Sequence, residues 1–274
     1  MRSNNLDTRA NYGGTIPEYY DRCLGPAWFD AYGADLAQRL PDRFVGDVLE
    51  VACGTGLVTR RLRARINPAS RLVASDINPA MLDYARTKLA DCRGIEWREA
   101  DVGRLPFEAG EFSAVVCAFG VMFLPDKGAA FREVHRVLER GGIFLFNVWD
   151  RIEENAAAAI AAEVIEGLFP GDTEVQLATP YELHDAAPLR RWLLEAGFQE
   201  ERIEKKRIQV GGISARQIAL GQIRGSPRSL LIEKRGVSLD DVIGKVAAAL
   251  ARTGGADPWR GPASAVVVEA RAGG

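Results

Sequence analysis

A glycine-containing turn is the stretch of this sequence best suited to hold a small polar ligand. The turn, Gly54-Thr55-Gly56, follows an apolar segment that ends near Glu50, and a helical pattern begins directly after it. Glycines at a strand-to-helix turn let the backbone approach a ligand, because no Cβ stands in the way. The free N–H groups at the start of the helix favour a polar or negatively charged group. These residues therefore predict a small-molecule cofactor site.

Two aspartates follow the next two segments of the chain that are predicted to be strands. Asp76 follows residues 71–75 and lies twenty residues beyond Gly56, and Asp101 ends the segment after that one. An acid at the end of a second strand suits recognition of ribose hydroxyls, in a dinucleotide or in another nucleoside cofactor. The dinucleotide fingerprint G-x-G-x-x-G is incomplete here, because Thr59 stands at the position of the third glycine. The acids alone leave both cofactor classes open.

The elements that must position these residues alternate between strand and helix. Expected strands cover residues 47–52, 71–75, 95–99, 112–118, 143–149, 202–210 and 265–270. Such alternation predicts an α/β fold, with a Rossmann-like, doubly wound and mostly parallel seven-stranded sheet and one antiparallel strand near the C-terminus. Right-handed crossovers bring the carboxyl ends of the parallel strands to one edge. We expect Glu50, Asp76, Asp101 and Ala118 to meet there.

The pattern divides the chain into three parts. Residues 1–40 include a helical segment rich in aromatic residues, broken near Gly25-Pro26, which would pack on the core or form a lid over the cofactor site. Residues 41–150 are the expected Rossmann-like core. Residues 151–274 complete the sheet, and helical insertions at about 151–185 and 212–260 predict a cap.

Composition argues against several other kinds of protein. The chain has 274 residues, 47% of them hydrophobic, and a formal net charge of −2, so a strongly basic face for nucleic acid is not expected. The charged runs 204–207 and 233–235 mix both signs, which is typical of solvated faces. The four cysteines form no CxxC pair, so neither a metal site nor a disulfide framework is predicted. Without an apolar signal segment or a spanning run, we expect a cytoplasmic protein.

Five motifs in order make the sequence resemble the class I S-adenosylmethionine-dependent methyltransferases, closest to the type 11 group that includes the ubiquinone/menaquinone-biosynthesis methyltransferases. The motifs lie at residues 50–56, 75–82, 99–107, 112–116 and 133–142, so the resemblance covers roughly residues 45–150. It implies S-adenosyl-L-methionine as the cofactor and S-adenosyl-L-homocysteine as the product. Family members often have glycine where Ala52 stands, and alanine fits there if its φ is negative.

The resemblance also implies which residues face the methionine part of the cofactor. These are the turn residues Ala52, Cys53, Gly54 and Gly56. Glu50 would support the turn. Ala118 and Phe119, at the end of the fourth strand, would line the methionine and the reacting methyl group.

The nucleoside part of the cofactor has its own implied set of residues. Asp76 would accept hydrogen bonds from both ribose hydroxyls, which a carboxylate can do with its two oxygens. Ile77 and Met81 would pack on the adenine. Asp101 would accept a hydrogen bond from the exocyclic amine, and Val102 would offer its backbone N–H to the ring.

The methyl acceptor and any catalytic group are less well specified. Methyl transfer needs the acceptor, the methyl group and the sulfur to be aligned, and a strongly nucleophilic acceptor needs no base. No residue stands out as a catalytic base, although His184 is a better candidate than His135, which lies in a core helix pattern. Tyr20, Met122 and Trp149 are candidates for the acceptor pocket, and a small, partly apolar acceptor is expected.

Two other functions remain compatible with the sequence. An NAD(P)-dependent oxidoreductase is disfavoured by the missing third glycine. A protein that binds S-adenosylmethionine without catalysis would suit the absence of an evident base. The methyltransferase is the leading interpretation, because five ordered motifs are more specific than any one of them.

Overall fold

The structure, a computed structural model, describes residues 12–273 and divides into two compact units. The first unit holds the N-terminal residues through Trp28, together with Ile152–Ala178 and Gln209–Ala263. The second holds Phe29–Arg151, Thr179–Ile208 and the residues from Ser264 onward. All five methyltransferase-like motifs therefore lie in the second unit.

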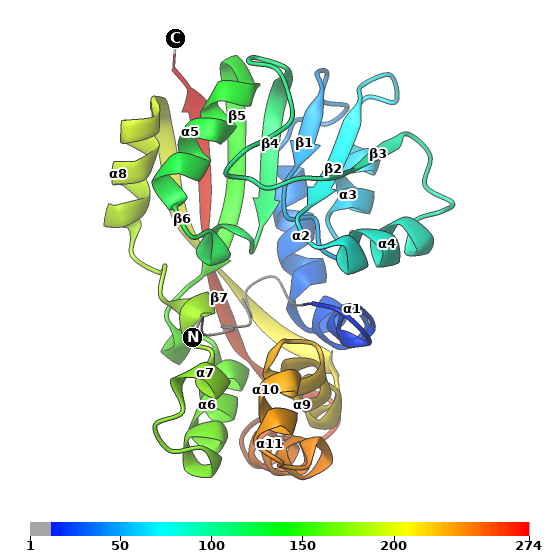
Figure 1. The fold of residues 1–274 in the computed structure, drawn as a ribbon, viewed down its shortest axis with the longest axis vertical. Coiled ribbons are helices and arrows are strands. Elements are labelled where there is room, and N and C mark those ends of the chain that lie inside the picture. The colour runs from blue at the N-terminus through cyan, green and yellow to red at the C-terminus, as the bar shows by residue number, and fades with distance from the viewer. Residues whose placement is uncertain (1–11, 274) are drawn as a thin grey trace, which may run out of the picture. The chain divides into compact units, whose positions relative to one another are not determined.

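A seven-stranded sheet with the order β3-β2-β1-β4-β5-β7-β6 is the framework of the fold (Figure 1). Its strands are β1 (Val48–Glu50), β2 (Leu72–Asp76), β3 (Ile95–Glu99), β4 (Phe112–Ala118), β5 (Leu138–Trp149), β6 (Phe198–Ile213) and β7 (Trp259–Ala272). Parallel pairs join β1 to β2 and β4, β2 to β3, and β4 to β5, whereas β7 runs antiparallel to β5. The predicted mostly parallel sheet with one antiparallel strand near the C-terminus is confirmed.

Helices cover both faces of this sheet in the second unit. They are α2 (Asp30–Gln38), α3 (Thr59–Arg65), α4 (Pro79–Lys88), α5 (Lys127–Val137) and α8 (Ala186–Ala196), with the 3-10 turns η2 (Val121–Phe123) and η4 (Thr179–Tyr181). Neighbouring residues of a strand point to opposite faces. Leu145 of β5 packs in one core cluster with Leu36 of α2 and Leu62 of α3, so α2 and α3 cover that face.

The other face of β5 packs against α5, and α5 in turn against α8. The ring of Phe131 on α5 lies 5.4 Å from that of Phe146 and 6.3 Å from that of Trp192 on α8, measured between centroids. Figure 1 shows α5 and α8 side by side next to β5. A strand covered on both faces must be apolar on both, which is why residues 143–149 form a nearly unbroken apolar run.

Helices make up most of the described part of the first unit. They are α1 (Ile16–Tyr19), the π-helix η1 (Tyr20–Phe29), η3 (Ile152–Glu154), α6 (Ala156–Leu168), α7 (Thr173–Gln176), α9 (Ala215–Arg224), α10 (Arg228–Lys234) and α11 (Leu239–Gly254). The helix α11 packs on α9 and α6 through a buried stripe at helical spacing that includes Val242, Val246 and Leu250. Among residues 12–273, no helix is long and apolar enough to cross a membrane.

Two local predictions are wrong. The helical segment is not broken at Gly25-Pro26, because Pro26 is accommodated inside the wider turns of η1. The charged run 204–207 is also not a simply solvated face. Glu204 pairs with Arg39 at 2.6 Å and Lys206 pairs with Asp35 at 2.8 Å. These pairs join β6 to α2, a contact between distant segments that local composition does not reveal.

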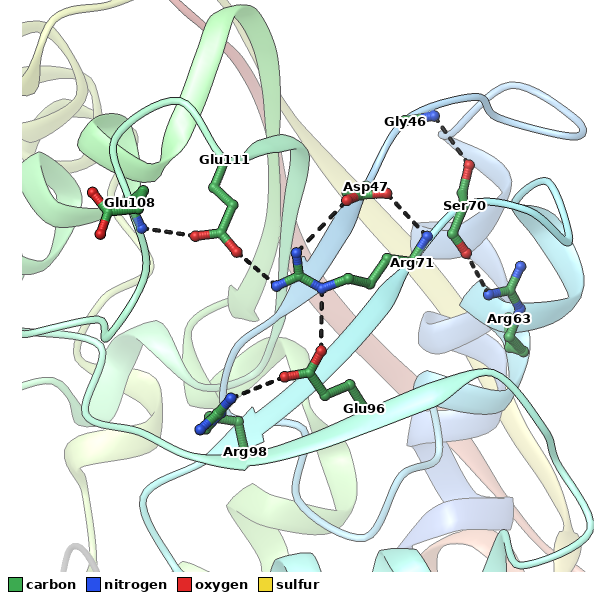
Figure 2. Close-up of polar contacts among 9 residues, drawn as sticks. All are labelled: Gly46, Asp47, Arg63, Ser70, Arg71, Glu96, Arg98, Glu108 and Glu111. Carbon is green, nitrogen blue, oxygen red and sulfur yellow. Dashed lines mark hydrogen bonds and ion pairs between the residues drawn. The ribbon is translucent and has the colours of Figure 1, made fainter.

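Arg71 joins the amino-terminal ends of four strands (Figure 2). It precedes β2 and pairs with Asp47 before β1, Glu96 on β3 and Glu111 before β4, at N–O distances of 3.7, 3.2 and 2.6 Å. Burial acts to raise the pKa of Glu111, but the hydrogen bonds from Arg71 and the Glu108 N–H, together with the charges of Arg71 and Arg136, hold that pKa below its ordinary value. The strands are thereby held together at the edge opposite their carboxyl ends.

Replacing Arg71 with alanine is expected to lower the free energy of unfolding by about 1–2 kcal/mol, because three partly exposed carboxylates lose their shared cation. The folded-state pKa of Glu111 is depressed, so its contribution is present above the ordinary pKa and is lost as pH falls through the folded value. Parent and variant should therefore converge on acidification in urea unfolding measured over a pH series. Arg98→Ala, which removes an exposed pair with Glu96, is the control. A deficit that persists unchanged into acid would contradict this account.

Candidate functional site

The carboxyl ends of β1, β2, β4 and β5 lie next to one another at one edge of the sheet. The register pairs Ala118 at the end of β4 with Asn147 near the end of β5. The Cys53 N–H, after β1, donates to the Ser75 carbonyl of β2 at 2.9 Å. Residues far apart in the sequence are therefore brought to one edge, as the parallel topology predicts.

Left-handed backbone conformations shape the turn after β1. The φ angles are +52° at Ala52, +55° at Gly54 and +75° at Gly56. A Cβ on Gly56 would lie 2.9 Å from Cδ1 of Leu89, so glycine is required there for space as well as for conformation. The condition under which alanine would fit without strain, a negative φ, is therefore not met at Ala52. The chain must turn sharply from β1 into this loop, and an L-residue at that point is strained.

Ala52→Gly is expected to raise the free energy of unfolding by up to about 1 kcal/mol. Relief of left-handed strain, about 1–2 kcal/mol, is partly offset by the extra chain entropy of glycine, about 0.5–1 kcal/mol. The control is Ala74→Gly in the buried strand β2. This variant has the entropy cost of glycine but relieves no left-handed backbone strain. Denaturant unfolding of both variants tests this, and equal losses of stability would refute strain at Ala52.

Asp76 links the turn to the start of α4. Its side chain is 8% exposed, and its two oxygens each accept a backbone N–H at 2.8 Å, Oδ2 from Gly54 and Oδ1 from Asn78. Burial raises the pKa of this carboxyl, while the amides of Asn78, Gly54 and Ile77 act to lower it. Each carboxylate oxygen can accept two hydrogen bonds, so Oδ2 retains a lone pair for a ligand.

The carboxyl group of Glu50 is buried beside this turn. Burial raises the pKa of its carboxyl to about 8, the Thr59 hydroxyl acts to lower it, and the charge of Asp76 raises it further. In the part of the chain that the structure describes, Glu50 Oε2 and Thr55 Oγ1 are buried without hydrogen-bond partners. Unsatisfied buried polar atoms at the mouth of a glycine turn are typical of a ligand site.

The loops after β2 and β3 continue the same edge. Ala100 N–H donates to the Asp76 carbonyl at 3.1 Å, which places these loops together. Ile77 is 51% exposed, an unusual position for a large apolar side chain. Met81 and Val102 are buried, whereas Asp101 is exposed and accepts the Gly103 N–H on Oδ1 at 2.8 Å. The arrangement offers an apolar surface flanked by two acids.

An aromatic cluster lies beyond the end of β4. Phe119 has a φ of +52°, a conformation that bulky residues rarely adopt. Its ring stacks on Trp149 at a centroid distance of 4.2 Å and an interplanar angle of 30°. Phe29 and Tyr32 meet the Phe119 ring edge-on, at 5.3 and 5.4 Å. Met122, on the following 3-10 turn, is buried.

The two histidines have different surroundings. His184 Nδ1 lies 2.9 Å from the Tyr181 carbonyl, and because a carbonyl only accepts, Nδ1 carries a proton and Nε2 is the basic nitrogen of the neutral ring. The Tyr181 ring in turn lies 6.1 Å from that of Trp149. His135 packs at 5.1 Å against the Phe198 ring, away from the strand carboxyl ends. Tyr20 belongs to η1 in the first unit.

Sequence patterns do not single out several residues of this edge. Phe29 and Tyr32 are placed in a helix by periodicity, but nothing in the pattern assigns them to the sheet edge. Tyr181 follows no recognised motif. Asn147 has a signal that could have been used, because it is the one side-chain amide in the apolar run 143–149. A lone amide in a buried strand needs partners.

Comparison with known proteins provides independent findings. Residues 48–142 match a family described as "Methyltransferase domain". The chain is 32% identical over 164 residues to the ubiquinone/menaquinone biosynthesis C-methyltransferase UbiE of Pseudomonas aeruginosa, a match that covers 55% of this chain and 64% of that protein. The chain therefore spans somewhat less than two thirds of the length of that relative.

Two solved structures share the fold. A SAM-dependent methyltransferase of Thermotoga maritima has a TM-score of 0.53 and 14% identity, with 93% of this chain and 95% of that one covered. Phosphoethanolamine N-methyltransferase 2 of Haemonchus contortus, in complex with phosphomonomethylethanolamine and S-adenosylhomocysteine, has a TM-score of 0.55 and 13% identity, with 96% of this chain and 61% of that one covered. At such identities the likeness concerns the fold alone.

Proposed function

We propose that this protein transfers a methyl group from S-adenosylmethionine to a small, partly apolar acceptor, because residues 48–142 match a family described as a methyltransferase domain and the chain is similar to a C-methyltransferase. One observation carries the proposal. The turn after β1, the Asp76 loop and the strained turn at Phe119 all lie at the carboxyl edge of one parallel sheet. S-adenosylhomocysteine is the expected product.

The polar groups of this edge fit the sugar and amino-acid ends of the cofactor. Asp76 would accept hydrogen bonds from the ribose hydroxyls with the lone pairs that Gly54 and Asn78 leave free. The methionine end would lie against the turn residues Ala52, Cys53, Gly54 and Gly56. Glu50 would support this turn. Among residues 12–273, Glu50 Oε2 and Thr55 Oγ1 are buried without hydrogen-bond partners, which suits a polar ligand nearby.

The remaining cofactor contacts involve the loops after β2, β3 and β4. Exposed Ile77 and buried Met81 would pack on the adenine. Asp101 would accept a hydrogen bond from the adenine amine and Val102 would offer its N–H. Ala118 and Phe119 would line the methionine chain and the methyl group.

Bound S-adenosylmethionine supplies an electrophilic methyl group, which the acceptor takes by in-line displacement while the electron pair of the carbon–sulfur bond stays on sulfur. The residues of this chain orient the acceptor and exclude water, the main protein contribution to such a reaction. Phe119 and Trp149 would supply the apolar wall. For an oxygen or carbon acid, His184 Nε2 is the candidate to accept the proton that leaves.

The three predicted parts of the chain would have separate roles. Residues 1–40, of which 1–11 lie outside the described residues, would serve as a lid, residues 41–150 as the cofactor-binding core, and the insertions at about 151–185 and 212–260 as a cap. Tyr20, Met122 and Trp149 would line the acceptor pocket. We also propose that the acceptor is a small molecule and that the protein is cytoplasmic.

Binding and turnover together test the proposed function. Isothermal titration should give tighter binding of S-adenosylhomocysteine and S-adenosylmethionine than of NAD. Release of S-adenosylhomocysteine from a panel of phenols, amines and quinone precursors should identify an acceptor. Preferential binding of NAD would overturn the methyltransferase assignment. Cofactor binding without turnover on the panel would favour a non-catalytic role, which the domain match does not favour.

A further inference from the structure

Glu133 and Arg136 on α5 form an ion pair that also binds the loop between β3 and β4, residues 100–111. Two guanidinium nitrogens of Arg136 donate to the two carboxylate oxygens of Glu133, Nε to Oε2 at 2.9 Å and Nη2 to Oε1 at 2.7 Å. The pair belongs to the motif at residues 133–142 and lies outside the proposed cofactor contacts. A pair joined by two parallel hydrogen bonds has a fixed geometry, so it can orient the backbone that it binds.

Three backbone groups of this loop are bound by the side chains of the pair. Glu133 Oε1 accepts the Leu105 N–H at 2.8 Å, and Arg136 donates to the carbonyls of Leu105 and Phe107 at 3.1 and 2.8 Å. The hydrogen bond from Arg136, together with the Leu105 amide and the charge of Arg136, holds the pKa of Glu133 below its ordinary value, although burial acts to raise it. Glu133 is therefore ionised at neutral pH, and its hydrogen bond to the loop is charge-assisted.

The part of the loop that carries Asp101 is fixed at both of its ends. The Ala100 N–H donates to the Asp76 carbonyl at 3.1 Å, which attaches the start of the loop to the end of β2. A tight turn follows, in which the Arg104 N–H donates to the Asp101 carbonyl at 2.9 Å. Leu105 comes directly after this turn and is 4% exposed. The turn is therefore held by β2 on one side and by α5 on the other.

The far end of the loop has a separate attachment. Glu111 accepts the Glu108 N–H at 2.7 Å and pairs with Arg71 at 2.6 Å (Figure 2). This attachment lies before β4, at the amino-terminal edge of the sheet, whereas Asp101 follows the carboxyl end of β3. One attachment of the loop is thus next to the proposed site residues and the other is at the opposite edge.

The two residues after β3 and Ala100 offer a pattern of hydrogen-bonding groups that distinguishes purine bases. Adenine has an amine that donates beside a ring nitrogen that accepts, which suits the carboxylate of Asp101 and the N–H of Val102. Hypoxanthine has the reverse pattern, an oxygen that accepts beside a ring N–H that donates. Selection between them needs both protein groups at fixed positions, because a shift of either leaves a polar group unpaired. Asp101 is exposed and lies outside any helix or strand, so contacts elsewhere in the loop must fix its position.

We propose that the Glu133–Arg136 pair makes the cofactor site selective for adenine. Through Leu105 the pair holds Asp101 and Val102 in place, so both of its members are positioning residues that need not contact the cofactor. This inference rests on the proposed methyltransferase function, in which Asp101 and Val102 contact the adenine. A loop that is ordered before the ligand arrives binds more tightly, because less conformational freedom is lost on binding.

The test compares S-adenosylhomocysteine with S-inosylhomocysteine, which has hypoxanthine in place of adenine. In isothermal titration the parent should prefer the adenine compound by about thirtyfold or more. In Arg136→Ala this preference should fall about fivefold or more, because affinity for the adenine compound decreases while affinity for the hypoxanthine compound hardly changes. Arg136→Lys keeps the charge but loses the planar fork, so its preference should lie between those of the parent and Arg136→Ala.

Arg71→Ala is the matched control, because it loosens the other attachment of the same loop. It should lower stability and yet leave the preference for adenine within about twofold of that of the parent, since the two attachments are at opposite edges of the sheet. Hydrogen exchange gives a second readout that does not depend on the ligand. In the free protein, exchange of the Leu105 N–H should increase more in Arg136→Ala than in Arg71→Ala.

The possible outcomes separate a positioning role from a purely structural one. An unchanged preference in Arg136→Ala, or an equal decrease in Arg71→Ala, would overturn the proposal. Equal affinity of the parent for the two compounds would overturn it as well. If Arg136→Ala does not fold, Arg136→Lys and Glu133→Gln decide, and a preference equal to that of the parent in both would contradict the positioning role. Failure of the parent to bind either compound would instead refute the underlying methyltransferase function.

Discussion

Replacing Asp76 with alanine is expected to weaken the binding of S-adenosylhomocysteine about a hundredfold or more, because hydrogen bonds to a charged acceptor contribute about 1.5–3 kcal/mol each. Asp76 is 8% exposed and already accepts the N–H groups of Gly54 and Asn78 at 2.8 Å. A carboxylate held in this way is oriented before the ligand arrives. Its removal takes away the ribose contacts and loosens the turn after β1 at the same time.

Asp76→Asn separates these two effects. The amide keeps one oxygen for a backbone N–H but has no charge, so an intermediate loss of about tenfold is expected. Asp83→Ala, an exposed position on α4, should leave the affinity unchanged and serves as the control. Isothermal titration gives the affinity and thermal unfolding reports the fold. An Asp76→Ala variant that is folded and binds within about threefold of the parent would remove the ribose role.

Glu50→Gln is expected to stabilise the free protein at neutral pH by as much as about 3 kcal/mol. The folded-state pKa of Glu50 is raised to about 8, against an ordinary value of 4.5 in the unfolded chain. Between these values the folded state holds a proton that the unfolded state has released. Stability therefore falls as pH rises through this window, and it is least above the folded pKa. A neutral glutamine has no such dependence.

Denaturant unfolding of parent and Glu50→Gln over a pH series measures this difference. The gain in stability should be near zero below the ordinary pKa of glutamate and should grow with rising pH. Glu111→Gln is the opposite control, because the pKa of Glu111 is lowered and its contribution is lost in acid. Parallel pH profiles for parent and Glu50→Gln would contradict the raised pKa. A buried acid that is kept for function lowers the stability of the folded protein. Its replacement, here Glu50→Gln beside the turn after β1, is therefore expected to be stabilising.

The order of strands and helices could be predicted from local patterns. Apolar runs such as residues 112–118 specify buried strands, and caps such as Asn78 before Pro79 specify where helices begin. Once the alternation is known, topology brings Glu50, Asp76 and Ala118 to one edge. These parts of the site depend on residue type and on position along a strand, which the sequence contains directly.

Other features depend on contacts between segments that are far apart in the chain. The positive φ of Ala52, the pairing of Glu204 with Arg39 and the rings of Phe29 and Tyr32 around Trp149 have no local signature. Residue 147 shows the distinction most clearly. The sequence places an asparagine in a buried strand, but only the folded chain satisfies its oxygen with the Phe119 N–H and leaves its nitrogen without a partner among residues 12–273.

The amino-acid sequence by itself therefore determined the fold class and the family resemblance from which the cofactor is proposed, because hydrophobic periodicity, turn residues and motif order are properties of the chain alone. The tertiary structure determined the left-handed backbone at Ala52 and Phe119, the burial that raises the pKa of Glu50, and the hydrogen bond from the Phe119 N–H to Asn147. Those properties arise from burial and from the geometry of polar contacts between distant segments. The methyl donor can be proposed from the sequence, whereas the surroundings of each candidate site residue become known only from the folded chain.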